Sequence, residues 1–336
     1  MRTQGLSEEL RMKLMTRTVS GSLLLALALC IPALAQATFD KALALEKQGR
    51  YAEAQKAYEE VLAREGNNAM ASYRLGQLYL YHLRRSDLAI QYLEKAVALD
   101  EKNSDYHLRL AEAYTAAAPH AGIIKRTSMT RQIKNQLDLA LQYNSRSIPA
   151  HQGLIQFYVQ APAVLGGSYR SAHQQADSLV RLDAVEGWLA HGGIYYLEGS
   201  KGKAEEAFRK AIAANPRDSR GYRELGQFYV TEKRFDDAIA QLKKHVELNP
   251  ASGPGYYSLG EAYSGRQMYR EALSAYLQVL QKDANVAPAY FEAAQCHERL
   301  GQKQDALKYY RLFVARFPGA PRAPAAKQKI AELSRG

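Results

Sequence analysis

Cysteine is nearly absent from this sequence of 336 residues, which has only Cys30 and Cys296. So small a number excludes a disulfide framework and a cysteine-rich zinc site. Tryptophan occurs once, whereas tyrosine occurs 23 times and phenylalanine eight times. Hydrophobic residues make up 47% of the chain. This composition is typical of a folded, helix-forming chain and not of a disordered one.

Long apolar runs are missing as well. The longest extends over residues 23–34 and, with about twelve residues, is too short for a bilayer span, which takes roughly 20. Lys13 and Arg17 precede this run, and Ala35-Gln36-Ala37 follows it. That order is typical of a secretory signal with cleavage after Ala37. We therefore predict a signal peptide over residues 1–37, export to the periplasm and no transmembrane span.

Cys30 leaves one alternative open. Leu27-Ala28-Leu29-Cys30 faintly resembles a bacterial lipoprotein box, which would anchor the chain in the outer membrane through a lipid on Cys30. That box requires a small residue directly before the cysteine, whereas Leu29 is large. In the soluble interpretation, the mature chain keeps Cys296 alone and can form no internal disulfide.

The charge is basic. Removal of residues 1–37 takes away four basic and two acidic residues, so the formal net charge falls from +11 to +9. The segment 306–336 holds seven Lys or Arg residues and one acid, Glu332. A basic chain often binds nucleic acid, but export argues against that partner. An anionic envelope surface or an acidic protein fits better.

Signatures of catalysis and metal binding are also missing. The eight histidines are scattered, and no HExxH or Gly-x-Ser-x-Gly motif occurs. Gly166-Gly167 and Gly192-Gly193 lack the preceding strand and the Gly-Lys-Ser/Thr of a phosphate loop. Cys296-His297-Glu298 is interpreted as structural, because His297 takes the place of a packing tyrosine. We predict no catalytic residue, no cofactor and no metal site, in a chain that is not an enzyme.

What the sequence does contain is a period of 34 residues. Four series share one register: Ala204, Ala238, Ala272, Ala306; Trp188, Tyr222, Tyr256, Tyr290; Gly192, Gly226, Gly260, Ala294; and Tyr195, Tyr229, Tyr263, His297. Tyr222, Gly226 and Tyr229 are spaced by four and three, so they share one face of a helix. The small residues predict a close helix crossing, and the aromatics fill the wider gaps beside it. Asn215-Pro216 and Asn249-Pro250 end successive units.

These residues resemble the tetratricopeptide repeat family, most strongly between Gly187 and Pro318. Weaker copies begin upstream, at Gly49, Gly76, Tyr106 and Leu154. The resemblance implies an all-α solenoid of about eight 34-residue helix-turn-helix units with a C-terminal cap helix. We expect divergent units over residues 38–184, four regular units over 185–320, and a cap helix with a basic tail over 321–336.

Two upstream units have enlarged turns between their helices. The third turn gains about ten residues around 119–125, and the fourth gains about five at 161–167. Equivalent turns lie along one edge of a stacked array. We therefore predict that Ile123, Ile124, Val164 and Leu165 form a joint ridge that docks a partner or narrows one end of the groove. The alternative is that these aliphatic side chains pack onto the adjacent helices.

In the family, the first helices of successive units line a concave groove. Mapped by phase, that partner-binding groove includes Tyr73, Gln77, Tyr81, Gln152, Gln156, Arg223, Gln227, Tyr257, Glu261, Phe291 and Gln295. This polar and aromatic mixture suits a protein or peptide segment. We predict an exported scaffold or adaptor for envelope assembly or maintenance. The alternatives are an envelope-polymer hydrolase and a membrane-anchored lipoprotein, each using the array as a scaffold.

Overall fold

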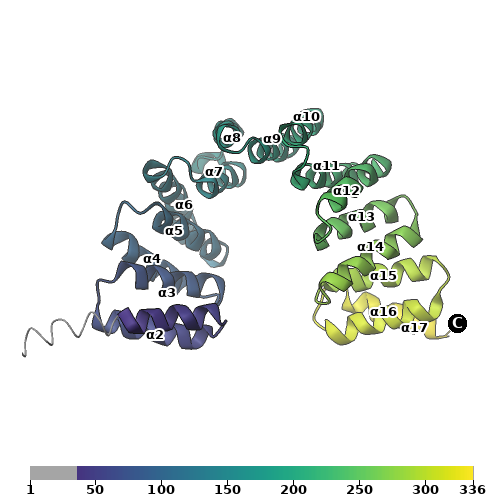
Figure 1. The fold of residues 1–336 in the computed structure, drawn as a ribbon, viewed down its shortest axis with the longest axis horizontal. Helices are drawn as coiled ribbons and strands as arrows, with labels where there is room; N and C mark the ends of the chain where they lie inside the picture. The colour runs from purple at the N-terminus through teal and green to yellow at the C-terminus, as the bar shows by residue number, and fades with distance from the viewer. Residues whose placement is uncertain (1–35, 336) are drawn as a thin grey trace, which may run out of the picture. The chain divides into compact units, whose positions relative to one another are not determined.

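The computed structural model describes residues 36–335, so Cys30 and nearly all of the expected signal peptide lie outside the described residues. Residues 36–335 form helices and short turns without a strand, which confirms the all-α prediction (Figure 1). The chain divides into two compact units, called unit 1 and unit 2, which end and begin at Ser168 and Tyr169. Each unit is described by itself.

Unit 1 is a stack of consecutive helices. A helix over residues 36–47 is followed by α2 (Tyr51–Arg64), α3 (Ala69–Tyr81), α4 (Ser86–Leu99), α5 (Ser104–Ala117), η1 (Ala118–His120), α6 (Ile123–Tyr143), α7 (Ile148–Gln160) and η2 (Ala163–Leu165). From α2 to α7, each α-helix packs against the next.

Unit 2 repeats the same plan more regularly. Its helices are α8 (Tyr169–Leu182), α9 (Ala184–Leu197), α10 (Lys201–Ala214), α11 (Ser219–Thr231), α12 (Phe235–Leu248), α13 (Gly253–Gly265), α14 (Tyr269–Lys282), α15 (Ala287–Arg299), α16 (Lys303–Arg316) and α17 (Ala323–Arg335). α17 lies where the cap helix is expected and packs against α16 with Ala323 and Ala326 buried. As predicted, α10 and α12 end directly before Asn215 and Asn249.

The first helix of most pairs begins at a side-chain cap. An Asn, Ser or Asp oxygen accepts a hydrogen bond from an amide of the first turn at Asn68, Asn103, Ser147, Asp183, Asp218 and Ser252. Each such cap stabilises a helix by about 0.5–2 kcal/mol. The second helices α2, α4, α10, α12, α14 and α16 lack a side-chain cap. Each of these second helices follows the preceding helix after a short turn, and the geometry of that turn determines where the second helix begins.

The periodic glycines lie at close helix crossings, as predicted. A Cβ atom on Gly226 would lie 2.6 Å from Cγ of Leu242, and one on Gly260 would lie 2.6 Å from Cε1 of Tyr276. The periodic tyrosines pack beside these crossings. Tyr229 is buried, and its hydroxyl donates a 2.7 Å hydrogen bond to Glu205 on the preceding helix. The small and aromatic series therefore serve the core.

The short turns contain a periodic feature that composition alone does not reveal. Gly199, Lys233, Gln267 and Gly301 all have a positive φ, between 58° and 77°, and they are spaced 34 residues apart. Each lies just after the first helix of its pair. Only glycine adopts this left-handed conformation without strain, so Lys233 and Gln267 hold a strained backbone.

The enlarged third turn is not the loop that we expected. Gly122 precedes α6, which begins at Ile123 and runs for 21 residues, against 13 or 14 in the other α-helices α2–α17. No glycine or proline interrupts residues 123–143, so most of the inserted residues continue the helix. The fourth turn does remain a turn: η2 ends at Gly166, whose φ of 101° suits only glycine.

Candidate functional site: a groove in unit 1

Unit 1 contains a cavity of about 940 Å³, here called the unit 1 groove. The first helices α3, α5 and α7, the second helix α6 and both enlarged turns contribute to it. Its lining residues are Leu80, Tyr81, Leu108, Ala111, Glu112, Thr115, Ala116, Ala118, Pro119, Arg126, Thr130, Ile133, Leu137, Pro149, Gln152, Gly153, Gln156, Phe157, Gln160, Ala161 and Pro162. This volume is in the range of protein ligand sites.

The floor of the unit 1 groove is apolar. Leu108 of α5, Leu137 of α6 and Phe157 of α7 are buried side chains that three different helices bring together. α6 and α7 meet closely because Gly153 has no side chain: a Cβ atom there would lie 2.7 Å from Cδ2 of Leu137. An aliphatic or aromatic group placed on this floor would lose its contact with water, which favours binding.

A row of glutamines forms one wall. Gln152, Gln156 and Gln160 are spaced four residues apart, so they share one face of α7, and all three are exposed. Ser147 fixes the start of this helix, because its hydroxyl accepts a hydrogen bond from the amide of Ala150. A primary amide both donates and accepts hydrogen bonds. The row is therefore suited to the N–H and C=O groups of a peptide backbone.

The α3 and α5 side carries a compensated charge. Arg109 Nη1 donates to Glu112 Oε1 at 2.7 Å and to the Tyr81 hydroxyl at 3.2 Å, and that hydroxyl also contacts Glu112. Burial, followed by the Glu112 contact, raises the pKa of Tyr81, so its hydroxyl keeps its proton. This edge of the groove is polar without being a strong electrostatic site.

Both enlarged turns border the groove, but through other residues than those predicted. Ala118 and Pro119 from the third turn, and Ala161 and Pro162 from the fourth, line the cavity. The aliphatic residues expected to form a ridge do not line it. Ile123, Ile124 and Val164 are 80%, 89% and 92% exposed, and Leu165 is half-buried.

Comparison with known proteins identifies the architecture. The tetratricopeptide repeat family model matches residues 39–105, 199–253 and 257–321, which together make up more than half of the chain. The chain belongs to the tetratricopeptide repeat (TPR) family. No curated protein matches the TPR chain.

Solved structures that resemble this TPR chain include MamA (AMB-1) and YrrB, the latter described as a TPR protein with an unusual peptide-binding site. MamA is 24% identical, with a TM-score of 0.40. The match covers 47% of this chain and 87% of the MamA chain. YrrB is 22% identical, with a TM-score of 0.43. The match covers 57% of this chain and 97% of the YrrB chain. At these scores, neither likeness supports an argument about ligands.

Of the groove residues predicted from TPR phase in unit 1, Tyr81, Gln152 and Gln156 line the cavity. Tyr73 and Gln77 do not. They are half-buried on α3, where Gln77 Nε2 donates to the Tyr73 hydroxyl at 3.0 Å. The Tyr73 ring also packs on Tyr106, with the centroids 4.7 Å apart.

Sequence reasoning missed several lining residues, and some of them had a detectable signal. Glu112 follows Gln77 by 35 residues, one more than the TPR period, because the intervening inter-helix turn has one extra residue. Gln160 continues the spacing of Gln152 and Gln156. Arg126 and Thr130 had no such signal, because they depend on α6 starting two turns earlier than a regular second helix.

In unit 2, three of the predicted groove residues contact neighbouring side chains. Arg223 pairs with Glu224 at 2.6 Å, and Gln227 Oε1 accepts a 2.7 Å hydrogen bond from the Ser258 hydroxyl. The Tyr257 ring packs edge-on against Tyr276. These side chains therefore have partners within the protein already.

Farther along unit 2, Phe291 needs correction. Its ring is only 6% exposed and lies beneath the Arg322 guanidinium, whose carbon is 5.1 Å from the ring centroid, so it is a core residue. Arg322 also pairs with Glu292. Burial, followed by the charge of Glu292, raises the pKa of half-buried Glu261. Gln295 is exposed.

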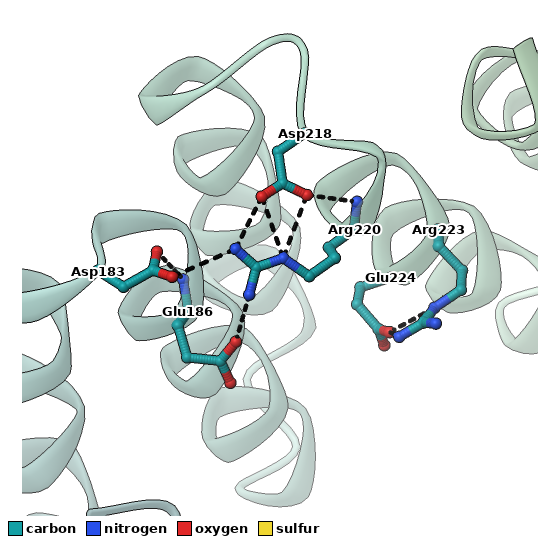
Figure 2. A network of polar contacts seen from close by, with 6 residues as sticks. All are labelled: Asp183, Glu186, Asp218, Arg220, Arg223 and Glu224. Carbon is teal, nitrogen blue, oxygen red and sulfur yellow. Dashed lines mark hydrogen bonds and ion pairs between the residues drawn. The ribbon is translucent and has the colours of Figure 1, made fainter. Parts of the chain in front are cut away.

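An arginine that sequence reasoning missed ties two TPR repeats of unit 2 together. Arg220, at the start of α11, contacts Asp218 at 2.7 Å, Glu186 at 2.8 Å and Asp183 at 3.2 Å (Figure 2). Asp183 and Asp218 are themselves the caps of α9 and α11. The hydrogen bonds that the guanidinium donates to Asp218 and then to Asp183 raise the pKa of Arg220. The network holds two helix starts in register.

A histidine pair joins α8 to α9 in unit 2. The Nδ1 atoms of His173 and His191 are 2.8 Å apart, and His191 Nε2 lies 3.0 Å from Asp177 Oδ1. Burial lowers the pKa of His191. One of the two facing nitrogens must lack a proton to accept the hydrogen bond.

Residues 36–335 contain neither a metal-binding cluster nor a helix suited to spanning a membrane. No three or more His, Cys, Asp or Glu side chains gather there into a metal-binding group. In the same residues, no helix combines the length and apolar character that crossing a bilayer requires.

Proposed function

We propose that this TPR protein is an exported scaffold or adaptor that holds a peptide segment of a partner protein in the unit 1 groove. The observation that carries the proposal is the cavity of about 940 Å³ with an apolar floor beside a row of amides. An extended segment would place an aliphatic or aromatic side chain on Leu108, Leu137 and Phe157. Its backbone would exchange hydrogen bonds with the glutamine row.

The protein acts by binding and not by catalysis in this proposal. The carboxylate and one of the hydroxyls that line the groove already have partners: Glu112 pairs with Arg109, and the Thr115 hydroxyl donates to the Ala111 carbonyl at 2.9 Å. Neither arrangement resembles a nucleophile held by a general base. The enlarged turns, which border the groove, would close one end of it around the segment.

The direct test fills the groove. Ala116 is an exposed residue on α5 that lines the cavity, so Ala116→Trp should block it. Ala240, an exposed alanine on α12 of unit 2, provides the matched variant Ala240→Trp. Peptides selected against the wild-type protein from a display library should bind the Ala240→Trp variant normally and the Ala116→Trp variant poorly. Equal binding to both variants would show that peptides bind elsewhere.

The partner itself can be trapped in cells. A photoreactive amino acid at Gln160 should crosslink to the partner, whereas the same group at Gln295 of unit 2 should not. Replacing Ala161–Gly167 with a short polar turn should abolish crosslinking while leaving the helical content intact. Crosslinking that survives this replacement would assign the fourth turn a structural role only.

Export and a role in the bacterial envelope are parts of the same proposal. They are supported by the basic residues, the apolar run and the Ala35-Gln36-Ala37 step in order at the N-terminus. Mass spectrometry of the protein purified from its native cells should find a chain that begins at Thr38. A chain that begins at a lipidated Cys30 would instead establish an anchored lipoprotein.

A further inference from the structure

The N-terminal end of α6 exposes two adjacent isoleucines to solvent. Ile123 and Ile124 are 80% and 89% exposed, and the first buried residue of α6 is Met129. The residues before Met129 therefore extend past the packed part of the helix. We call residues 123–131 the α6 tip. Packing of unit 1 does not require these isoleucines, and they do not line the unit 1 groove.

The same segment is strongly basic. Lys125, Arg126 and Arg131 are exposed, and no Asp or Glu occurs between residues 113 and 137. His120 lies in η1, which packs against α6. The nearest acids in the sequence are Asp138, which pairs with Lys134, and Glu112, which pairs with Arg109. Among the residues that the structure describes, no carboxylate forms an ion pair with Lys125, Arg126 or Arg131. The positive charge of the α6 tip is thus not neutralised by its surroundings.

The two properties meet on one surface of the helix. Ile124 and Arg131 are seven residues apart, so they lie along one side of α6. Lys125 directly follows Ile124 and is exposed at the same end of the helix. Met129, on the opposite side, faces the core. The end of α6 therefore presents apolar side chains next to cations. This combination suits a surface with an anionic outer layer and an apolar interior.

We propose that the α6 tip docks on an anionic lipid surface. The isoleucines would enter the boundary between headgroups and acyl chains, and the cations would meet the lipid phosphates. A protruding helix end can insert into a broad, deformable lipid surface. It offers no pocket, which a bound peptide would need. The docking surface adjoins the groove, which shares Arg126 and Thr130 with the α6 tip but none of Ile123, Ile124, Lys125 and Arg131, so one protein could hold a partner segment close to a membrane.

Vesicle flotation tests the proposal. The purified protein should float with vesicles of phosphatidylcholine and phosphatidylglycerol, but not with vesicles of phosphatidylcholine alone, and added salt should weaken binding. Replacing Lys125 and Arg131 together by glutamine should weaken binding roughly 30-fold, as expected for two cations at an anionic leaflet. The double change Ile123→Ser with Ile124→Ser should weaken it at least roughly tenfold.

Two control variants should bind vesicles as the wild type does. Val164 is 92% exposed in the neighbouring turn, but no Lys or Arg lies within four residues of it, so Val164→Ser should bind vesicles as the wild type does. The groove variant Ala116→Trp should also keep vesicle binding, which separates this proposal from peptide binding. Thermal midpoints should stay unchanged, because the altered side chains are exposed.

Several results would overturn the proposal. The wild type could fail to prefer anionic vesicles, or both double variants could bind them as well as it does. If residues 23–34 remain on the purified chain, they would bind neutral vesicles too and would not respond to changes in the α6 tip. The proposal would also fail if the isoleucine double variant kept vesicle binding but lost peptide or partner binding. That would make the α6 tip a protein contact.

Discussion

Units 1 and 2 share the same repeat but use its inner side chains differently. In unit 1, Gln156 and Gln160 are exposed beside an apolar floor, and a cavity of about 940 Å³ lies next to them. In unit 2, Gln227 accepts a hydrogen bond from Ser258, and Phe291 is buried beneath Arg322. The same family pattern therefore produces an open surface in one unit and a self-satisfied surface in the other.

The physical cause of the difference is regularity. From α9 to α16, unit 2 keeps the 34-residue period, so Gly192, Gly226 and Gly260 each meet the side chain 16 residues further along the chain. Unit 1 breaks the period with its enlarged turns and with the 21-residue α6. A longer second helix moves its side chains relative to the first helices and leaves space between them. Strict repetition gives the close helix crossings of unit 2, and the departure from it in unit 1 coincides with the cavity.

The largest expected effect comes from disturbing the regular unit. Gly226→Leu should destabilise unit 2 by about 1–3 kcal/mol or more, because even a Cβ atom there would lie 2.6 Å from Leu242. Gly202 is the control: it lies on α10 with no heavy atom within 4 Å of a Cβ, so Gly202→Ala should be neutral or stabilising by up to about 1 kcal/mol. Thermal unfolding measures both. An unchanged midpoint for Gly226→Leu would contradict the close crossing.

A smaller effect is expected at the left-handed turn position. Gly199 has a φ of 77°, so Gly199→Ala should destabilise unit 2 by about 1 kcal/mol. Gln267 occupies the same place with a φ of 63°, and Gln267→Gly should relieve its strain. The gain should stay below about 1 kcal/mol, because glycine also makes the unfolded chain more flexible. Denaturant titrations in which both variants shift in the same direction would be inconsistent with this turn geometry.

These two tests also mark what the sequence could predict. The glycine crossings follow from residue type and a 34-residue spacing, so Gly226 and Gly260 were predictable. The left-handed turn was not, because Lys233 and Gln267 occupy it alongside Gly199 and Gly301 and no single residue type marks it. Phase placed Phe291 on the groove, but its ring packs against Tyr310 and Phe313 of α16 and lies beneath Arg322. Phase carries no information about these contacts.

The unit 1 groove likewise combines residues that the sequence predicts with residues that it does not. Spacing by four along α7 identified Gln152 and Gln156, since both are set by local helix geometry. The floor formed by Leu108, Leu137 and Phe157 was not predicted, because it depends on how α5, α6 and α7 pack. Residues 119–125 were predicted to belong to an enlarged turn, yet α6 begins at Ile123, because no glycine or proline interrupts the helix from there on.

Acid should weaken unit 2 by a modest amount. Burial lowers the pKa of His191 from its ordinary value of about 6.5, so the folded state binds this proton less readily than the unfolded chain. The stabilisation is complete above about pH 6.5 and is lost as pH falls through the lowered pKa of the folded state. Denaturant midpoints at pH 7.5 and pH 5.5 should differ less in His191→Gln than in the wild type. Equal pH dependence in the two proteins would remove His191 from this role.

The smallest perturbation uses Cys296 as a reporter for unit 2 alone. Its thiol is buried in the core of that unit, and burial raises its pKa to about 11. Because the thiolate is the reactive form, alkylation at pH 8 should be slow in the native protein. In mild denaturant, the rate should rise as the core of unit 2 opens, while a fluorophore on an exposed cysteine at Gln160→Cys reports on the groove. If regularity stabilises unit 2, the groove signal should change at a lower denaturant concentration than Cys296 alkylation does. The reverse order would show that the irregular unit is the more stable one.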